Sequence, residues 1–301
     1  MVLPQEKERA LPFYNAYKKV AFKAMYFVLL LFIISLSFLI YKQVTTGEFI
    51  EKDITLSGGV SFSFSAPQEI TKQQLAGIAE NILGDTVLVR SIDTGTRIEY
   101  TIESRVQDRE LISQLTEELE SLGIAQVNVS LIGQTLGASF FRDAIRALII
   151  AFILMGVAVF IIFRQPLPSI YVVFAAAATI VETVFITNIF GIALSTGGLA
   201  ALLMLLGYSV DTDIVLTTRV LKTKGQEVHE RAIAGLRTGL TMSITSLAAT
   251  ITGFIVSQSP MIKEIMLILT IGIVFDLINT WLFNAPILIK YVQKKEGVRA
   301  R

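Results

Sequence analysis

Four carboxylic acids of this chain lie inside long apolar segments, where a charged group is costly. Asp211 and Asp213 belong to the stretch GYSVDTDIVLTTR at residues 207–219, and Glu182 and Asp276 lie near the middles of two other apolar segments. Aspartate at membrane depth costs about 2.5–3.5 kcal/mol on insertion scales, so such acids are rare and usually functional. No lysine or arginine lies equally deep in these segments. We interpret the four acids as an ion-coupling site, with the proton as the first candidate ion.

Asp211 and Asp213 cannot point the same way, because two residues span about 200° around a helix. One of them can line the interior of a helix bundle while the other faces a partner subunit or a water-filled crevice. Removal from water and a second carboxylate nearby both disfavour the charged form of such a group, which suits a proton relay. Each acid also has a structural alternative, in which it only hydrogen-bonds a neighbouring helix.

Polar side chains accompany the acids in the last three apolar segments. One segment holds a helical stripe of threonines with spacings of 3, 4 and 7: Thr238, Thr241, Thr245 and Thr252. Asn279 and Thr280 share a helical face with Asp276. Arg219 closes its segment as a counter-ion or as an anchor to lipid headgroups, and Arg237 is placed to pair with one of the acids. The supporting residues we predict are therefore Thr241, Thr245, Asn279, Arg219 and Arg237.

The composition is that of a membrane protein. Of the 301 residues, 53% are hydrophobic, and the mean hydropathy is +0.64. The net charge of +1 gives no reason to expect nucleic acid as a partner, and the absence of cysteine excludes disulfides and thiol chemistry. No nucleophile–base pattern, zinc motif or phosphate-binding loop is present, so we predict no enzyme activity, no cofactor and no metal.

Six apolar runs are long enough to cross a membrane, since about 20 helical residues span a ~30 Å hydrocarbon core. They cover residues 24–42, 144–163, 168–190, 197–218, 233–257 and 262–289. A hydrophilic segment, 43–142, separates the first run from the other five, which occupy 143–290, and residues 1–23 and 291–301 form polar ends. The predicted fold class is a membrane protein, an α-helical bundle of six transmembrane helices with one external domain.

Lysines and arginines in the short connections set the orientation across the membrane. Both ends of the chain are basic, as are the connections around Arg164 and between residues 219 and 231, whereas 191–196 and 258–261 contain no basic residue. This alternation predicts a multi-pass protein of the cell membrane with both termini in the cytoplasm and residues 43–142 outside.

The external segment has the pattern of a small α+β domain. Strand-like stretches lie at 59–64, 86–91, 96–102 and 126–132, and helix-like stretches at 71–81 and 107–122. The order β-α-β-β-α-β is that of the ferredoxin-like, split βαβ unit. Gly58 and Gly59 at its start indicate a turn or close backbone packing near the membrane.

Several motifs, taken in order, resemble the SecF family of protein-export membrane proteins, which belongs to the resistance–nodulation–division (RND) superfamily. They are LSGGV at 56–60, IGQTLGASFFRDA at 132–144, GYSVDTDIVLTTR at 207–219, RTGLTMSIT at 237–245 and Asn-Ala-Pro at 284–286. The residues Asp211-Thr212-Asp213 stand where bacterial members carry Asn-Asp-Thr. In this respect the chain resembles the archaeal branch of the family. Glu182 stands where bacterial third spans commonly carry Asp.

This resemblance implies a subunit that pairs with SecD and assists protein translocation through a SecYE-type translocon, driven by a proton or sodium gradient. Its further partners would be the translocating polypeptides and membrane lipids. Two other functions stay open at this point. One is a half-size RND-type exporter of lipids or small hydrophobic molecules, and the other is a structural translocon subunit that conducts nothing.

Overall fold

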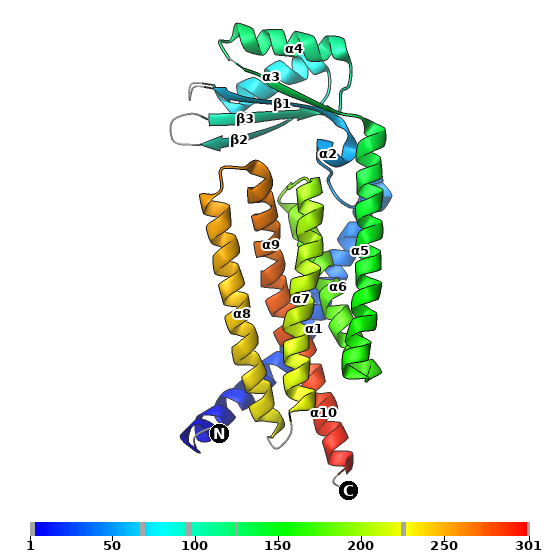
Figure 1. Ribbon diagram of the computed structural model, residues 1–301, viewed down its shortest axis with the longest axis vertical. Coiled ribbons are helices and arrows are strands. Elements are labelled where there is room, and N and C mark those ends of the chain that lie inside the picture. The colour runs from blue at the N-terminus through cyan, green and yellow to red at the C-terminus, as the bar shows by residue number, and fades with distance from the viewer. Residues whose placement is uncertain (1–3, 67–69, 94–97, 125, 224–226, 300–301) are drawn as a thin grey trace.

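The computed structural model describes residues 4–66, 70–93, 98–124, 126–223 and 227–299, and it is elongated (Figure 1). A small domain built on a β-sheet lies at one end, and a bundle of long helices forms the rest. Both termini lie at the end of the bundle that is remote from the sheet (Figure 1). The termini and the sheet domain are therefore separated by the full length of the helices.

The bundle consists of long helices whose starts are encoded locally. Ser195 caps one of them by accepting hydrogen bonds from the N–H groups of Gly197 and Gly198, and two others begin with proline in their first turn. The helical elements are α1, Pro4–Thr46; α5, Gln134–Phe163; α6, Pro166–Ile189; α7, Thr196–Lys222; α8, Val228–Val256; α9, Pro260–Asn279; the π-helical turn η1, Thr280–Asn284; and α10, Ala285–Arg299.

Among the described residues, five helices are long and apolar enough to cross a membrane: Lys23–Thr46, Gln134–Phe163, Pro166–Ile189, Thr196–Lys222 and Glu230–Val256. They overlap the first five predicted spans. The sixth predicted span, 262–289, is helical through α9, η1 and α10, but α9 carries Lys263, Glu264 and Asp276. The predicted polar ends are also helical where they are described, at 4–23 and 291–299. The sixth crossing stays a prediction.

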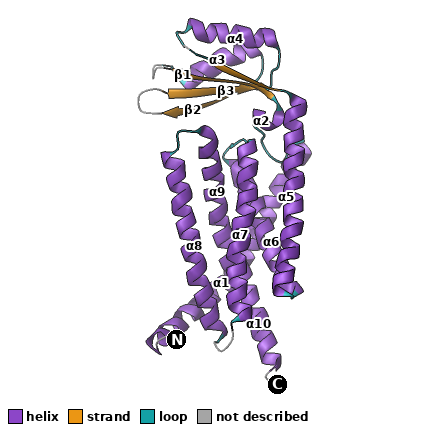
Figure 2. Cartoon of the chain, viewed as in Figure 1, coloured by secondary structure: helices purple, strands orange, loops and turns teal. Residues whose placement is uncertain are grey.

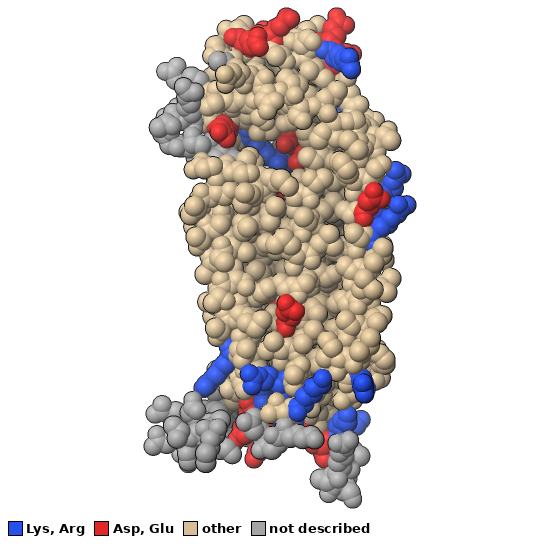
Figure 3. All heavy atoms as spheres, in the orientation of Figure 1, with Lys and Arg blue, Asp and Glu red and all other residues tan. Residues whose placement is uncertain are grey.

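The surface of the bundle has the charge distribution expected of a membrane protein. On the face shown in Figure 3, the helical body is mostly uncharged, and lysines and arginines gather at the end that carries the termini. Apolar side chains are exposed to a large extent on α1 and α5, among them Phe27, Ile33, Ile153 and Leu154. Large exposed apolar surfaces of this kind need lipid or protein as their environment.

The domain at the other end contains a four-stranded antiparallel sheet with two helices on one face (Figure 2). The strands lie in the order β2-β3-β1-β4. In chain order, the elements are β1, Gly59–Ala66; α3, Lys72–Leu83; β2, Leu88–Asp93; β3, Ile98–Ser104; α4, Arg109–Ser121; and β4, Asn128–Ile132. This succession of strands and helices is the one that the sequence pattern predicts, with most boundaries shifted by one or two residues.

The two faces of this sheet differ because alternate residues of a strand point to opposite sides. Buried apolar residues of the strands pack with α3 and α4 to form the core of the domain: Val60, Phe62, Phe64, Ile102, Leu75 and Leu115. The pairing register places Ser61 beside Glu103 and Ser63 beside Thr101 on the opposite face. That polar face is the one turned towards the helical bundle (Figure 1).

The sheet domain is joined to the bundle through a crowded turn, as Gly58 and Gly59 indicated. Gly58 has a φ of +78° and ends the short helix α2, Ile54–Ser57. A Cβ atom on Gly58 would lie 2.5 Å from the Cα atom of Gln134 at the start of α5, and one on Gly59 would lie 2.2 Å from the carbonyl oxygen of Ser104. Only glycine combines this backbone conformation with such close contacts.

We expect Gly58→Ala to destabilise the protein more than Gly84→Ala. Gly84 also has a positive φ, of +65°, but a Cβ atom there would contact nothing within 4 Å. The control substitution should cost about 1–2 kcal/mol from the left-handed backbone alone, and Gly58→Ala should cost about 1–3 kcal/mol more from overpacking. Thermal unfolding in detergent measures the difference, and equal losses would contradict the role given to the turn.

Candidate intramembrane acid site

Three of the four predicted acids are buried where α6, α7 and α9 pack against one another. Glu182 lies on α6, Asp213 on α7 and Asp276 on α9, and each is 0% exposed to solvent. The sequence predicts that one of the two aspartates of the fourth span faces the interior and the other faces outward. The structure agrees, because Asp213 is buried and Asp211 is exposed. The helical phase of the two residues causes this difference.

Asp213 accepts hydrogen bonds from two side chains of the turn that directly follows α9. The Thr280 hydroxyl donates to Asp213 Oδ1 at 3.0 Å, and the Asn284 side-chain amide donates to the same oxygen at 2.8 Å. Both donors belong to η1, and π-helical turns occur frequently at functional sites. The π-helical turn therefore supplies the hydrogen bonds that satisfy a carboxyl group on the neighbouring helix.

Asp276 lies beside Asp213 and is bonded from α7. The Ser209 hydroxyl donates to Asp276 Oδ1. Thr212 also lies beside Asp276, but its hydroxyl donates to the Tyr208 carbonyl at 3.3 Å. Asp213 and Asp276 are close enough for their negative charges to repel, so the two groups form one electrostatic unit.

Glu182 forms a second polar centre on α6. The side-chain amide of Asn279 donates to Glu182 Oε2 at 2.7 Å and approaches the Thr179 hydroxyl oxygen at 3.1 Å. Asn279 is 1% exposed and directly precedes Thr280, which binds Asp213. Adjacent residues at the end of α9 and the start of η1 thus contact both centres. This agrees with the prediction that Asp276, Asn279 and Thr280 share one helical face.

Each of the three carboxyl groups has one oxygen without a hydrogen-bond donor. Asp213 Oδ2, Asp276 Oδ2 and Glu182 Oε1 are buried and accept no hydrogen bond within the described part of the chain. Nor does any lysine or arginine among the described residues form an ion pair with these acids. A buried carboxylate without a cation is costly, whereas a carboxylic acid, or a carboxylate with a bound cation, is not. The arrangement can therefore hold a proton or a small cation.

The other predicted residues lie outside this centre. Arg219, Arg237, Thr241 and Thr245 are exposed on α7 and α8. The Thr241 and Thr245 hydroxyls each donate to a backbone carbonyl of the preceding turn, at 2.8 and 3.0 Å. Neither hydroxyl donates to an acid within the described part of the chain, and the expected closeness of the threonine stripe to the acids stays a prediction. Threonine can satisfy its hydroxyl within its own helix, so spacing alone does not show which way a stripe faces.

Asn284, Ser209 and Thr179 belong to the centre, although none of them is among the site residues predicted from the sequence. Asp276, Thr280 and Asn284 follow one another at spacings of four, and Thr179 precedes Glu182 by three. Those spacings place each of them on the same helical face as an acid. A search for hydroxyl and amide side chains one or two turns from each acid would have found them.

Comparison with known proteins agrees with the order of motifs along the chain. The family model described as "Protein export membrane protein SecD/SecF, C-terminal" matches residues 112–294. This chain belongs to that family. The resemblance predicted from the sequence motifs is thereby confirmed, and the chain is a membrane protein of the SecF type rather than an unrelated helical bundle.

Relatives of this family match over most of the chain. Protein-export membrane protein SecF of Pyrococcus furiosus is 36% identical over 279 residues, which cover 91% of this chain and 92% of that protein. SecF of Methanolacinia petrolearia is 37% identical over 272 residues, which cover 88% and 92%. Both organisms are archaea, as the Asp211-Thr212-Asp213 sequence led us to expect.

The fold is shared with a larger protein of known structure. The crystal structure of SecDF, a translocon-associated membrane protein from Thermus thermophilus, matches with a TM-score of 0.74 and 17% sequence identity. The match covers 91% of this chain but only 38% of that chain. SecDF in its super-membrane-facing form matches with a TM-score of 0.63. These two structures support the fold of the family member described here.

The hydrogen bonds at Asp213 predict a difference between the two aspartates of α7. Asp213→Leu should leave the Thr280 hydroxyl and the Asn284 amide buried without an acceptor, at a cost of about 1–3 kcal/mol for each group. Asp211→Leu is the matched control on the exposed side of the same helix and should change stability little. Thermal unfolding can be followed through Trp281, the only tryptophan of the chain. Equal destabilisation by both substitutions would contradict the assignment.

Proposed function

We propose that this chain is the SecF-like subunit of a SecD–SecF-type complex that assists protein translocation across the cell membrane. We further propose that the pair of Asp213 and Asp276 carries the coupling proton. The observation that carries this proposal is the full burial of both carboxyl groups on adjacent helices. In each group, one oxygen accepts from protein donors and the other has no donor among the described residues.

The chemistry of the pair explains why a proton would be bound and released there. Two neighbouring carboxyl groups in an apolar bundle cannot both be charged at low cost, because burial and mutual repulsion act in the same direction. A proton added to Asp213 turns an acceptor oxygen into a donor, so its hydrogen bonds with neighbouring side chains must change. Thr280 and Asn284 of η1 bind this carboxyl group. The proton can thereby alter the packing of α10 against α7.

We infer that Glu182 acts in series with this pair. Glu182 binds Asn279, and Asn279 is joined through α9 to Asp276 and to Thr280. A change at either centre would therefore reach the other through one helix. We expect Glu182→Gln to reduce ion coupling only partly, because glutamine keeps the acceptor for the Asn279 amide.

The exposed polar residues of α7 and α8 support a partner protein inside the membrane. Asp211, Thr241 and Thr245 are exposed in a single chain, and lipid cannot satisfy a carboxylate. SecDF of Thermus thermophilus contains far more chain than the part that matches this protein. We propose that a SecD-type protein covers this surface, mainly through α7, α8 and α9. A SecYE-type translocon and translocating polypeptides would be further partners of the complex.

The proposal includes a topology with six crossings, the last formed by α9 with η1 and α10. Both termini would be cytoplasmic, because the basic residues gather at that end, and the sheet domain would be an external, ferredoxin-like unit. A reporter enzyme fused after Ser121 should therefore be active outside the cell, and one fused after Lys222 should be active inside. The reverse pattern would contradict the orientation, and two reporters on the same side would contradict the number of crossings.

Ion flux tests the role of Asp213 directly. In vesicles that contain this chain with its SecD-type partner, we expect Asp213→Asn to reduce proton flux to the background of protein-free vesicles. Asparagine keeps the oxygen that accepts from Thr280 and Asn284, so protein level and partner association should not change. Asp211→Asn is the matched control two residues away and should retain flux close to that of the wild type.

Three outcomes separate this proposal from the alternatives. Wild-type flux in Asp213→Asn would rule out the buried pair as the proton carrier. Flux that follows a sodium gradient instead of a pH gradient would keep the site and change the ion. Normal protein export by Asp213→Asn, with reduced export only when Asp213→Leu weakens the complex, would indicate a purely structural subunit.

A further inference from the structure

Charged side chains from separate segments meet where the sheet domain faces the helical bundle. Arg90 of β2 lies between two carboxylates, with its Nη1 atom 3.9 Å from Asp53 Oδ2 and its Nη2 atom 3.6 Å from Glu103 Oε2. Glu103 belongs to β3, and Asp53 caps α2 just before the sheet begins. Glu264, near the start of α9, also lies close enough to interact electrostatically with Glu103. We call Arg90, Asp53, Glu103 and Glu264 the junction cluster.

The junction cluster connects two separately anchored parts of the molecule. Arg90 and Glu103 are on the sheet. The segment of Asp53 is fixed to the connection between α6 and α7, because the Asp53 N–H donates to the Leu194 carbonyl at 3.0 Å and the Leu194 N–H donates to the Glu51 carbonyl at 2.7 Å. The N–H of the next residue, Ser195, donates to Glu264 Oε1 at 2.9 Å. Asp53 and Glu264 thus belong to the bundle side of the junction.

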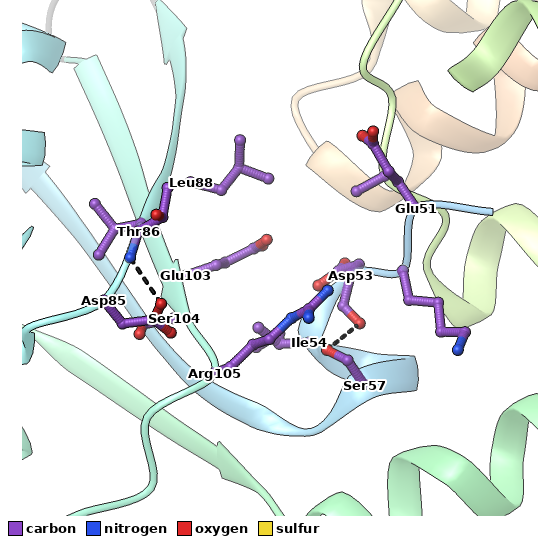
Figure 4. Close-up of a pocket in the computed structure, with 13 residues that line it drawn as sticks. Glu51, Asp53, Ile54, Ser57, Asp85, Thr86, Leu88, Glu103, Ser104 and Arg105 are labelled. Atoms are coloured by element: carbon purple, nitrogen blue, oxygen red, sulfur yellow. Dashed lines mark hydrogen bonds between the residues drawn. The ribbon is translucent and has the colours of Figure 1, made fainter. Parts of the chain in front are cut away.

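The two carboxylates that face Arg90 are buried next to an open cavity. The side chains of Asp53 and Glu103 are 7% and 9% exposed, and both line a cavity of about 450 Å³. Figure 4 shows Glu103 and Arg105 extending from the side of the sheet towards Asp53, and Asp85 lines the same cavity further away. Figure 3 shows charged side chains of both signs in the hollow between the sheet domain and the helices. Water can therefore reach the cluster when the junction loosens.

The charges in the cluster do not balance. Its three carboxyl groups face one arginine, and three of the other nearby cations have acidic partners outside the cluster. Lys42 pairs with Glu51 at 2.9 Å, whereas Lys52 and Arg105 pair with Glu48 at 3.2 and 3.6 Å. Lys263 lines a neighbouring cavity with Glu264 and Arg90. Burial, and next the charge of Asp53, raise the pKa of Glu103 to about 7, although Arg90 opposes the shift.

We propose that the junction cluster is a proton-sensitive latch, which holds the sheet domain against the helical bundle while Glu103 is protonated and loosens when Glu103 ionises. A protonated Glu103 can share its hydrogen with Asp53 and leaves Arg90 to neutralise that aspartate. An ionised Glu103 adds a third negative charge around one arginine. This latch lies outside the intramembrane site and requires no ion flow through the bundle, so it holds or fails independently of the proposed coupling function.

The direction of the pH effect follows from the pKa of Glu103. When the junction is open and Glu103 is solvated, the pKa has its ordinary value of 4.5, and when the junction is closed it is about 7. The closed state therefore binds the proton more tightly. The latch is strongest below pH 4.5, weakens between pH 4.5 and 7, and is weakest above pH 7. The ratio of open to closed junctions should rise on the order of a hundredfold across this interval, since one pKa unit corresponds to a factor of ten.

Amide hydrogen exchange of the whole protein in lipid nanodiscs measures this opening even when it is rare. The informative amides are those of Asp53 and Leu194, which are hydrogen-bonded and buried on the bundle side of the junction, where water reaches them when the sheet domain moves away. After correction for the intrinsic pH dependence of exchange, their protection should fall on the order of a hundredfold between pH 4.5 and pH 8. Amides in the middle of α9 should show no such fall.

Substitutions distinguish the latch from a merely structural contact. Glu103→Gln cannot ionise, so the protection of these amides should become independent of pH. Asp53→Asn removes the neighbouring charge and should move the fall in protection to lower pH. Glu99→Gln is the matched control, because Glu99 is an exposed acid on the same face of β3, and it should behave like the wild type. Protection that is independent of pH in the wild type would overturn the proposal, as would a wild-type pH dependence in Glu103→Gln.

Discussion

A carboxyl group inside an apolar bundle must find hydrogen-bond donors, and the packing of α6, α7 and α9 depends on this requirement. Asp213 and Asp276 obtain their donors from each other's helices, so neither helix can move far without leaving a buried charge unsatisfied. Gly272 permits the close approach that this exchange needs. A Cβ atom there would lie 2.2 Å from Leu205 Cδ2, and these two residues precede Asp276 and Ser209 by one turn.

The same helices also reach the junction with the sheet domain. Ser195 caps α7 and contacts Glu264 of α9 at one end of the bundle, while the same two helices carry Asp213 and Asp276 further along. The segment before α2 is attached to this end by backbone hydrogen bonds to Leu194. The packed helices α7 and α9 thus connect the polar junction to the acid pair. A small shift of either helix at the junction can therefore be transmitted to the acid pair through packed side chains.

Membership of the SecD/SecF family bears on the polar residues that this chain exposes. Archaeal relatives match this chain over about nine-tenths of its length, whereas the matching SecDF structure is much longer than the chain. The exposed polar residues of α7 and α8 are what a bundle would carry if further protein normally covered it. The buried pair lies away from that surface, so its hydrogen bonds are complete within one chain except at the oxygens that can take a proton.

The sequence by itself determined the class of protein, the positions of the apolar helices, the order of strands and helices in the sheet domain and a set of four candidate acids, three of which are buried. These properties follow from local composition and from periods of 2 and 3.6 residues. Even the division between Asp211 and Asp213 follows from helical phase. Only the tertiary structure decided which acids are neighbours, that Asn284 and Ser209 bind them, and that Thr241 and Thr245 face outward. Those facts depend on the rotation and depth of each helix against the others, which hydrophobic periodicity leaves undetermined. The junction cluster was hidden for the same reason, because Asp53, Arg90, Glu103 and Glu264 are polar residues of distant segments that only the docking of the sheet on the bundle brings together.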